Sequence, residues 1–158
     1  MTRAAESGTG TVTAKGCVFC VLEARNEELV VHRGGLCYVI LNLYPYNNGH
    51  VMVVPNRHIA DLAETTSSER VELIELTRLS EMALAEGYRP DGVNVGINLG
   101  RTAGAGILEH LHVHLVPRWN GDTNFMGVLA ETRVLPEDLA QSAKRLRPVF
   151  ERLTAEKT

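Results

Sequence analysis

The sequence predicts an α+β fold, with a mostly antiparallel sheet and two main helices. Segments in which apolar and polar residues alternate come in runs, and two longer segments carry apolar residues at helical spacing. Runs of strands with two helices set among them are typical of this class. Because 158 residues suit one hydrophobic core, we expect a single domain over residues 15–158. The small and polar residues of the N-terminal stretch indicate a flexible tail over residues 1–14.

The expected strands begin with a meander, which follows a short helix-like piece at residues 21–28. The turn-rich stretch PYNNG joins the second and third strands as a hairpin with a longer loop. The segments expected as strands are residues 29–32, 36–44, 50–56, 92–100 and 110–118.

The first main helix is expected over residues 66–86. Thr66 and Glu69 have the spacing of a capping box, and the stretch GYRP supplies a stop. Apolar residues lie on two sides of this helix, which indicates a second packing partner such as another subunit. One side carries Leu73, Leu76 and Ala83, and the other carries Val71, Ile74 and Met82.

The second main helix is expected to begin near Pro136. Its apolar residues recur at helical spacing and form one stripe. The stripe consists of Leu139, Ala143, Leu146, Phe150 and Leu153.

Charge and cysteine content exclude several classes of protein. A formal net charge of −3 argues against nucleic-acid binding by bulk charge. The polar N-terminal stretch lacks the apolar run of a signal peptide, and no later segment is long enough to cross a bilayer, so we expect a cytoplasmic protein. Three cysteines without an export signal argue against a disulfide framework, and Cys37 is expected as a buried thiol.

The stretch EHLHVHLVPR, residues 109–118, places three histidines at alternate positions. On a strand His110, His112 and His114 share one face, while the apolar residues between them face the core. Adjacent imidazoles cannot all be cationic, so at least one is expected to be neutral near pH 7 and able to act as a nucleophile. The competing interpretation is a polar outer face that uses histidine by chance.

The stretch CVFC, Cys17 to Cys20, is ambiguous between zinc binding and redox chemistry. The thioredoxin type of motif needs a preceding strand, which is missing here. Zinc needs four ligands, usually cysteine or histidine, and the histidines are the remaining candidates.

The stretch HLHVHLV matches the motif of the histidine triad (HIT) superfamily of nucleotide hydrolases and transferases, and the sequence resembles that family over residues 17–126. NLYPYNNGHVMVVPNRH and NVGINLG resemble its other segments. The resemblance implies a HIT-like fold in which His112 forms a nucleotidyl-histidine at the α-phosphorus and His114 contacts the phosphate. It also implies that His50 buttresses the triad, Asn42 holds the ribose hydroxyls and Asn98 contacts phosphate.

Two positions refine this resemblance. His114 stands where the uridylyltransferase branch has glutamine, which disfavours nucleotidyl transfer between sugars. Many members have Gln or Ser where this chain has Gly106, so phosphate contact there would come from the backbone N–H groups of Gly104, Ala105 and Gly106. The alternative is that these glycines form only a flexible connection.

The same resemblance implies a structural zinc site. Zinc-bearing members join the Cys-x-x-Cys pair to a histidine after the third strand and to the first histidine of the triad, which here gives Cys17, Cys20, His58 and His110. The alternative is that the cysteines are reduced bystanders and His58 is a surface residue.

PRWNGDTNF, with LNLYPYNNGH upstream, resembles the bacterial diadenosine tetraphosphate phosphorylase branch. The expected substrate is a dinucleoside polyphosphate, with magnesium as its counter-ion and a homodimer as the assembly. No nucleic acid or membrane partner is expected. The alternatives are a purine nucleoside phosphoramidase or general nucleotide hydrolase of the hint-like branch, and a non-catalytic module that senses nucleotides.

Overall fold

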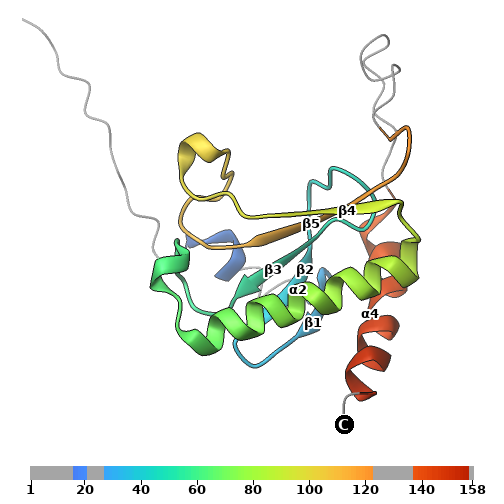
Figure 1. Cartoon of the computed structure of the whole chain (residues 1–158), viewed down its shortest axis with the longest axis horizontal. Helices are drawn as coiled ribbons and strands as arrows, with labels where there is room; N and C mark the ends of the chain where they lie inside the picture. The colour runs from blue at the N-terminus through green and yellow to red at the C-terminus, as the bar shows by residue number, and fades with distance from the viewer. Residues whose placement is uncertain (1–15, 21–26, 123–136, 157–158) are drawn as a thin grey trace, which may run out of the picture.

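The computed structural model describes residues 16–20, 27–122 and 137–156 (Figure 1). The expected tail over residues 1–14 and most of the helix-like piece over residues 21–28 lie outside this part of the chain. The described strands form one five-stranded sheet in the order β1-β2-β3-β5-β4, and every neighbouring pair is antiparallel. Together with two long helices, α2 (Ser67–Tyr88) and α4 (Leu139–Ala155), this arrangement confirms the α+β expectation.

Each expected strand segment overlaps an observed strand, and β1 extends one residue beyond its expected segment. The short helices η2 (Leu62–Glu64) and η3 (Arg101–Ala103) lie in the connections. The strands are β1 (Val30–Arg33), β2 (Cys37–Leu41), β3 (Val51–Pro55), β4 (Gly92–Gly96) and β5 (Val113–Arg118).

Strands β2 and β3 form the buried centre of the sheet. All their residues are buried, and their register runs from Cys37 opposite Pro55 to Leu41 opposite Val51. Beyond the last pair the Asn42 N–H donates to the His50 carbonyl at 2.9 Å. This bond closes the loop of residues 42–50 and places His50 at the start of β3, beside the middle of the sheet.

Helix α2 (Ser67–Tyr88) has the predicted capping box, in which Thr66 accepts from the Glu69 N–H and Glu69 accepts from the Thr66 N–H. The helix contacts β2, β3, β5 and α4 (Figure 1). The side that carries Leu73, Leu76 and Ala83 is buried, whereas on the other side Val71 and Ile74 are 72% and 65% exposed. The structure thus leaves an apolar face of α2 open in the single chain.

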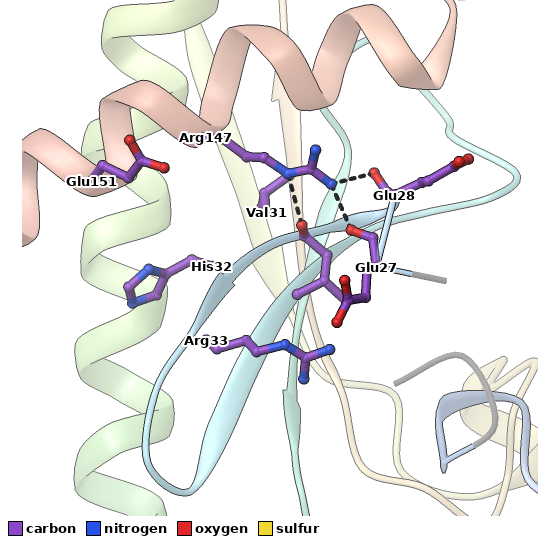
Figure 2. A pocket seen from close by; sticks show the side chains of 8 residues that line it. Glu27, Glu28, Val31, His32, Arg33, Arg147 and Glu151 are labelled. Atoms are coloured by element: carbon purple, nitrogen blue, oxygen red, sulfur yellow. Dashed lines mark hydrogen bonds between the residues drawn. The ribbon is translucent and has the colours of Figure 1, made fainter. Parts of the chain in front are cut away.

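Helix α4 (Leu139–Ala155) begins at the N-cap Asp138 and packs on β1, β2 and α2. Its predicted stripe faces the core, with Leu146 and Phe150 almost fully buried. Figure 2 shows Arg147 crossing a pocket of about 500 Å³ between α4 and β1. Its guanidinium donates to the carbonyl oxygens of Glu27, Glu28 and Val30 at 2.6 to 3.1 Å, which ties the chain entering β1 to α4.

Strand β5 is shorter than the sequence suggests. It begins at Val113, so His110 and His112 lie just ahead of the strand. The pairing of β5 with β3 begins at Val113, opposite Val53, although β3 itself continues to Pro55. Beyond that point the chain is held by the bond from the Leu111 N–H to the Ile59 carbonyl, at 2.6 Å.

Within the part of the chain that the structure describes, neither α2 nor any other helix is long and apolar enough to span a bilayer.

Candidate active site

Four predicted metal ligands meet at one end of the sheet. Cys17, Cys20, His58 and His110 each offer a donor atom, and these atoms all lie within 4.8 Å of one another. The cysteines come from the N-terminal segment 16–20, His58 follows β3, and His110 precedes β5. Elements far apart in the sequence therefore supply one compact set of two thiols and two imidazoles.

The spacing of these donors suits a tetrahedral ion. Cys17 Sγ lies 3.3 Å from His110 Nδ1, and Cys20 Sγ lies 3.6 Å from both His58 Nδ1 and His110 Nδ1. Zn–S and Zn–N bonds of about 2.3 and 2.0 Å at a tetrahedral angle imply sulfur–nitrogen separations of roughly 3.5 Å. The donor set and its distances therefore fit zinc.

The ring orientation of His110 also prepares it as a ligand. Its Nε2–H donates to the Pro55 carbonyl at 2.8 Å. In a neutral imidazole this leaves Nδ1, the atom that faces the two sulfurs, without a proton and free to bind a metal.

His112 is held as a neutral imidazole with one free nitrogen. Its Nδ1–H donates to the His110 carbonyl at 2.8 Å, and its side chain is almost fully buried. Burial lowers the pKa of His112, and the bond to the His110 carbonyl offsets part of that effect. The proton on Nδ1 leaves the lone pair on Nε2, so Nε2 is the atom able to attack an electrophile.

His50 and His114 form a hydrogen-bonded pair beside His112. The Tyr46 N–H can only donate, and it lies 3.2 Å from His50 Nδ1. Neutral His50 therefore carries its proton on Nε2 and donates to His114 Nδ1 at 2.9 Å. This leaves His114 with a proton on Nε2, ready to donate to an anion. The His112 and His114 rings lie 4.7 Å apart between centroids.

Both members of this pair are held neutral at pH 7. Burial, followed by the neighbouring His114 and His112, lowers the pKa of His50 from 6.5 to about 3. Burial, followed by His112, lowers the pKa of His114 from 6.5 to about 4. Neutral imidazoles keep a lone pair or a directed N–H at physiological pH, as nucleophilic chemistry requires.

We predict that this pair makes the fold sensitive to acid. The unfolded chain takes up protons first as the pH falls, so the free energy of unfolding should drop from about pH 6.5 down to about pH 4 for His114 and about pH 3 for His50. Each histidine contributes up to about 1.4 kcal/mol per pH unit. Urea unfolding of the wild type and of His114→Asn at several pH values across this range measures how the free energy of unfolding depends on pH. The variant should show a shallower decline, and an identical slope in both proteins would contradict the assignment.

The remaining predicted nucleotide-binding residues lie at different distances from the triad. Asn42 is partly buried, and its Nδ2 lies 3.3 Å from His50 Nε2. Asn98 is exposed in the connection between β4 and η3, and within the described residues no hydrogen bond joins it to the triad. The structure therefore places Asn42 directly beside His50, whereas no hydrogen bond within the described residues links Asn98 to the histidines.

The predicted glycine cradle follows η3. Gly104 has φ +88°, in the left-handed region that favours glycine, and its N–H donates to the Arg101 carbonyl at 3.1 Å. That N–H is thus directed to the protein. Ala105 and Gly106 are the members of the predicted cradle whose N–H groups have no protein partner within the described residues.

Comparison with known proteins identifies the family. The model of the HIT domain matches residues 23–121, which is more than half of the chain. The chain belongs to the HIT family. An AP-4-A phosphorylase of Mycobacterium tuberculosis (strain H37Rv) is 48% identical over 120 residues, covering 76% of this chain and 61% of the relative. The chain thus spans about three fifths of that relative's length.

Solved HIT structures share the fold. A Zn-bound histidine triad family protein from Mycobacterium smegmatis is 28% identical with a TM-score of 0.74, covering 90% of this chain and 99% of that one. A hypothetical histidine triad nucleotide-binding protein from Sulfolobus tokodaii is 29% identical with a TM-score of 0.73, covering 87% and 94%. The predicted HIT-like fold is therefore confirmed.

Two aromatic residues of the HIT site escaped the sequence argument. Phe19 is almost fully buried, and its ring lies 5.4 Å from that of His110 and 5.1 Å from that of His112. Tyr46 stacks on His50 with centroids 5.1 Å apart. Phe19 lies between the two cysteines of CVFC, and Tyr46 lies four residues before His50. These positions place both residues near the site, but they do not show which histidine ring each aromatic side chain contacts.

Proposed function

We propose that this chain is a nucleotide-processing enzyme that acts at the α-phosphorus of dinucleoside polyphosphates of the diadenosine tetraphosphate type. The observation that carries the proposal is His112, whose Nδ1–H donates to the His110 carbonyl and leaves Nε2 free beside His114. The M. tuberculosis relative named AP-4-A phosphorylase supports this substrate class.

In the proposed reaction, His112 Nε2 forms a bond to the α-phosphorus while the bond to the bridging oxygen breaks. The departing nucleotide leaves with the electron pair of that bond, and a nucleotidyl-histidine remains on His112. His114 Nε2–H donates to a non-bridging oxygen on which charge builds up. His50 acts through His114 by holding its tautomer, and Asn42 would meet the ribose hydroxyls.

A second acceptor then releases the nucleotide. Either water or inorganic phosphate attacks the phosphorus, and the phosphorus–Nε2 bond breaks so that His112 regains its lone pair. The products differ: attack by water gives AMP, whereas attack by phosphate gives ADP. We favour phosphate, because the segment after β5 and the M. tuberculosis relative both point to a phosphorylase.

Product analysis from diadenosine tetraphosphate tests this function. With inorganic phosphate present we expect ADP and ATP, and without phosphate we expect little ADP. AMP and ATP in both conditions would show a hydrolase instead. Turnover of phosphoramidates alone would show the hint-like activity, and nucleotide binding without turnover of any substrate would show a sensing module and overturn the proposal.

We further propose that Cys17, Cys20, His58 and His110 hold a structural zinc ion. Bound zinc would supply a fixed crosslink and no step of the reaction, because four protein ligands close the coordination shell. His110 would thereby be withdrawn from proton transfer, while His112 and His114 stay available. Magnesium, if present, would arrive with the oxygens of the polyphosphate.

We also propose a homodimer built on the open face of α2. Val71 and Ile74 are 72% and 65% exposed there, and Val95 on the edge strand β4 is 52% exposed. We predict that the wild type sediments as a dimer at micromolar concentration and that Ile74→Glu sediments as a monomer. A wild type that sediments as a monomer would contradict the proposed homodimer.

Residues 15–158 are proposed as one HIT domain that follows a tail over residues 1–14, and the chain is proposed to act in the cytoplasm. No nucleic-acid partner is proposed, because the formal net charge of −3 does not favour binding to a polyanion.

A further inference from the structure

The turn after β3 carries two contacts that shape the proposed metal site. The Pro55 carbonyl accepts from His110 Nε2–H at 2.8 Å, and His58 Nδ1 lies 3.6 Å from Cys20 Sγ. The turn of residues 55–58 therefore orients one ligand through its backbone and supplies another through a side chain. A change in the orientation of this turn would therefore displace both ligands, His58 and His110.

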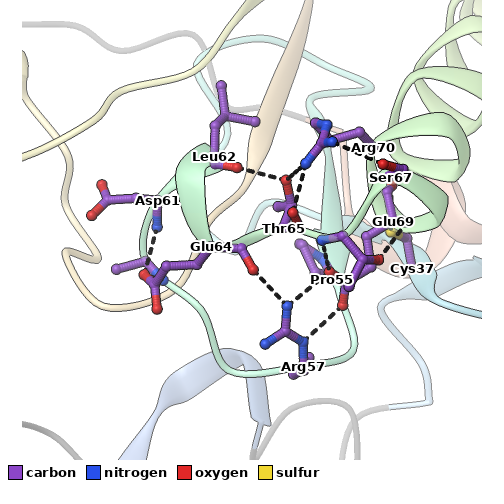
Figure 3. A network of polar contacts seen from close by, with 12 residues as sticks. Cys37, Pro55, Arg57, Asp61, Leu62, Glu64, Thr65, Ser67, Glu69 and Arg70 are labelled. Carbon is purple, nitrogen blue, oxygen red and sulfur yellow. Dashed lines mark hydrogen bonds and ion pairs between the residues drawn. The ribbon is translucent and has the colours of Figure 1, made fainter.

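Arg57 lies inside this turn and reaches away from the metal site. Figure 3 shows its guanidinium meeting Glu69 at the first turn of α2. Nε donates to Glu69 Oε1 and Nη2 donates to Glu69 Oε2, both at 2.9 Å. Nη2 also donates to the Glu64 carbonyl at 2.7 Å. The turn is thus joined at three points to the chain that enters α2.

The Glu69 carboxylate is itself held in place by burial and by a second hydrogen bond. Its side chain is only 6% exposed, against 51% for Arg57, and it also accepts from the Thr66 N–H at 2.7 Å. The hydrogen bond from Arg57, followed by that from Thr66, lowers the pKa of Glu69 to about 2, so the carboxylate stays charged near neutral pH. A two-point contact between guanidinium and carboxylate fixes orientation as well as distance.

The other side of the turn is held independently. The Asn56 N–H donates to the Leu36 carbonyl at 2.8 Å, and its side-chain Nδ2 donates to the Gly35 carbonyl at 3.1 Å. These bonds attach the turn to the β1–β2 hairpin. Arg57 supplies the second attachment, to α2.

We infer that the Arg57–Glu69 pair is a positioning device for the metal site, which holds the turn of residues 55–58 so that His58 and the Pro55 carbonyl keep the geometry that a metal ion needs. The inference rests on the proposed zinc site. Arg57 and Glu69 touch no metal ligand atom themselves and act through the turn. Partners that orient metal ligands typically change metal affinity by about 10- to 100-fold when they are removed.

The test compares zinc affinity, by chelator competition, in the purified full chain and in Arg57→Gln, Arg57→Lys and Glu69→Gln. We expect Arg57→Gln to weaken zinc binding by about 10- to 100-fold. Arg57→Lys should fall between it and the wild type, because lysine keeps the charge but loses the two-point contact. Glu69→Gln should weaken zinc binding to a similar extent, because it removes the other half of the same contact. The double variant Arg57→Gln/Glu69→Gln should bind zinc about as tightly as the more affected single variant, because both substitutions remove one interaction.

Arg70→Gln is the matched control. Arg70 belongs to the same polar network, but its side chain donates to Thr65 and Ser67, and within the described residues no hydrogen bond joins it to the turn (Figure 3). Its zinc affinity should stay within about threefold of the wild type, even if its unfolding temperature falls as far as that of Arg57→Gln. This separates positioning from general stability.

The cobalt-substituted proteins give a second readout, since the visible absorption of cobalt reports its coordination geometry. We expect an altered spectrum in Arg57→Gln and a wild-type spectrum in Arg70→Gln. Wild-type zinc affinity and cobalt spectrum in Arg57→Gln, or equal losses in both variants, would overturn the inference while leaving the zinc site in place. A wild type that binds no zinc would overturn the zinc site and the inference together.

Discussion

Replacing His112 with alanine should reduce turnover of diadenosine tetraphosphate by about 10⁴-fold or more, because it removes the only group proposed to form a bond to the substrate. His112 Nε2 is the free nitrogen of a ring whose Nδ1–H is already bound to the His110 carbonyl. The neighbouring His114 cannot replace it, since its Nδ1 accepts from His50 and its Nε2 carries the proton. Steady-state kinetics with nucleotide binding by calorimetry measure the effect.

Binding of AMP should survive in His112→Ala, because the ribose and phosphate contacts are proposed to come from other residues. The control is His32→Gln, which changes a histidine on β1 that stacks on Phe150 away from the triad. It should keep wild-type turnover. Activity of His112→Ala within tenfold of the wild type would contradict the role of His112.

Removing the metal should produce the largest change in stability. A ligand present at about 1,000 times its dissociation constant stabilises the folded state by about 4 kcal/mol. For a chain of 150 to 250 residues this corresponds to a shift of roughly 8–16 °C in Tm. We therefore expect a chelator, or the substitution Cys20→Ser, to lower Tm by about that amount, measured by calorimetry together with zinc content.

Cys37→Ala separates metal binding from thiol loss. Cys37 is fully buried, and burial, followed by Glu72 and Glu69, raises the pKa of its thiol to about 12, so it remains protonated. This variant should keep a full equivalent of zinc even if its core packing suffers. Less than about half an equivalent in wild-type protein prepared without chelator would contradict the metal site.

The parts of the fold that follow from local patterns could be predicted. Thr66 and Glu69 form the expected capping box because its rule involves residues only three apart. The buried stripe of α4 likewise follows from helical spacing. The start of β5 could not be predicted in this way, since it depends on how far its pairing with β3 extends, which is a property of another segment.

The candidate site shows the same division. The meeting of Cys17, Cys20, His58 and His110 was expected from the family resemblance, and the structure places their donor atoms together. The protonated nitrogen of each histidine could not be expected, because it is set by distant groups such as the Tyr46 N–H and the Pro55 carbonyl. The role of Arg57 is hidden for the same reason, since its partner Glu69 lies on another element.

Gly104 illustrates the limit of reading loops from composition. A glycine-rich stretch is compatible with phosphate binding, but the chain after η3 turns the Gly104 N–H back to the Arg101 carbonyl. A hydrogen bond of this kind depends on the path of the backbone, which a row of small residues leaves undetermined.

The covalent intermediate is the most direct test of the proposed mechanism. The protein is mixed with diadenosine tetraphosphate labelled at the α-phosphorus, quenched with alkali within milliseconds and digested, and the labelled peptide is identified by mass spectrometry. We predict an adenylyl group attached to His112 in the wild type, formed and lost at rates that account for turnover, and no label in His112→Ala. A label on another residue, or turnover without any labelled peptide, would contradict a nucleotidyl-histidine at His112.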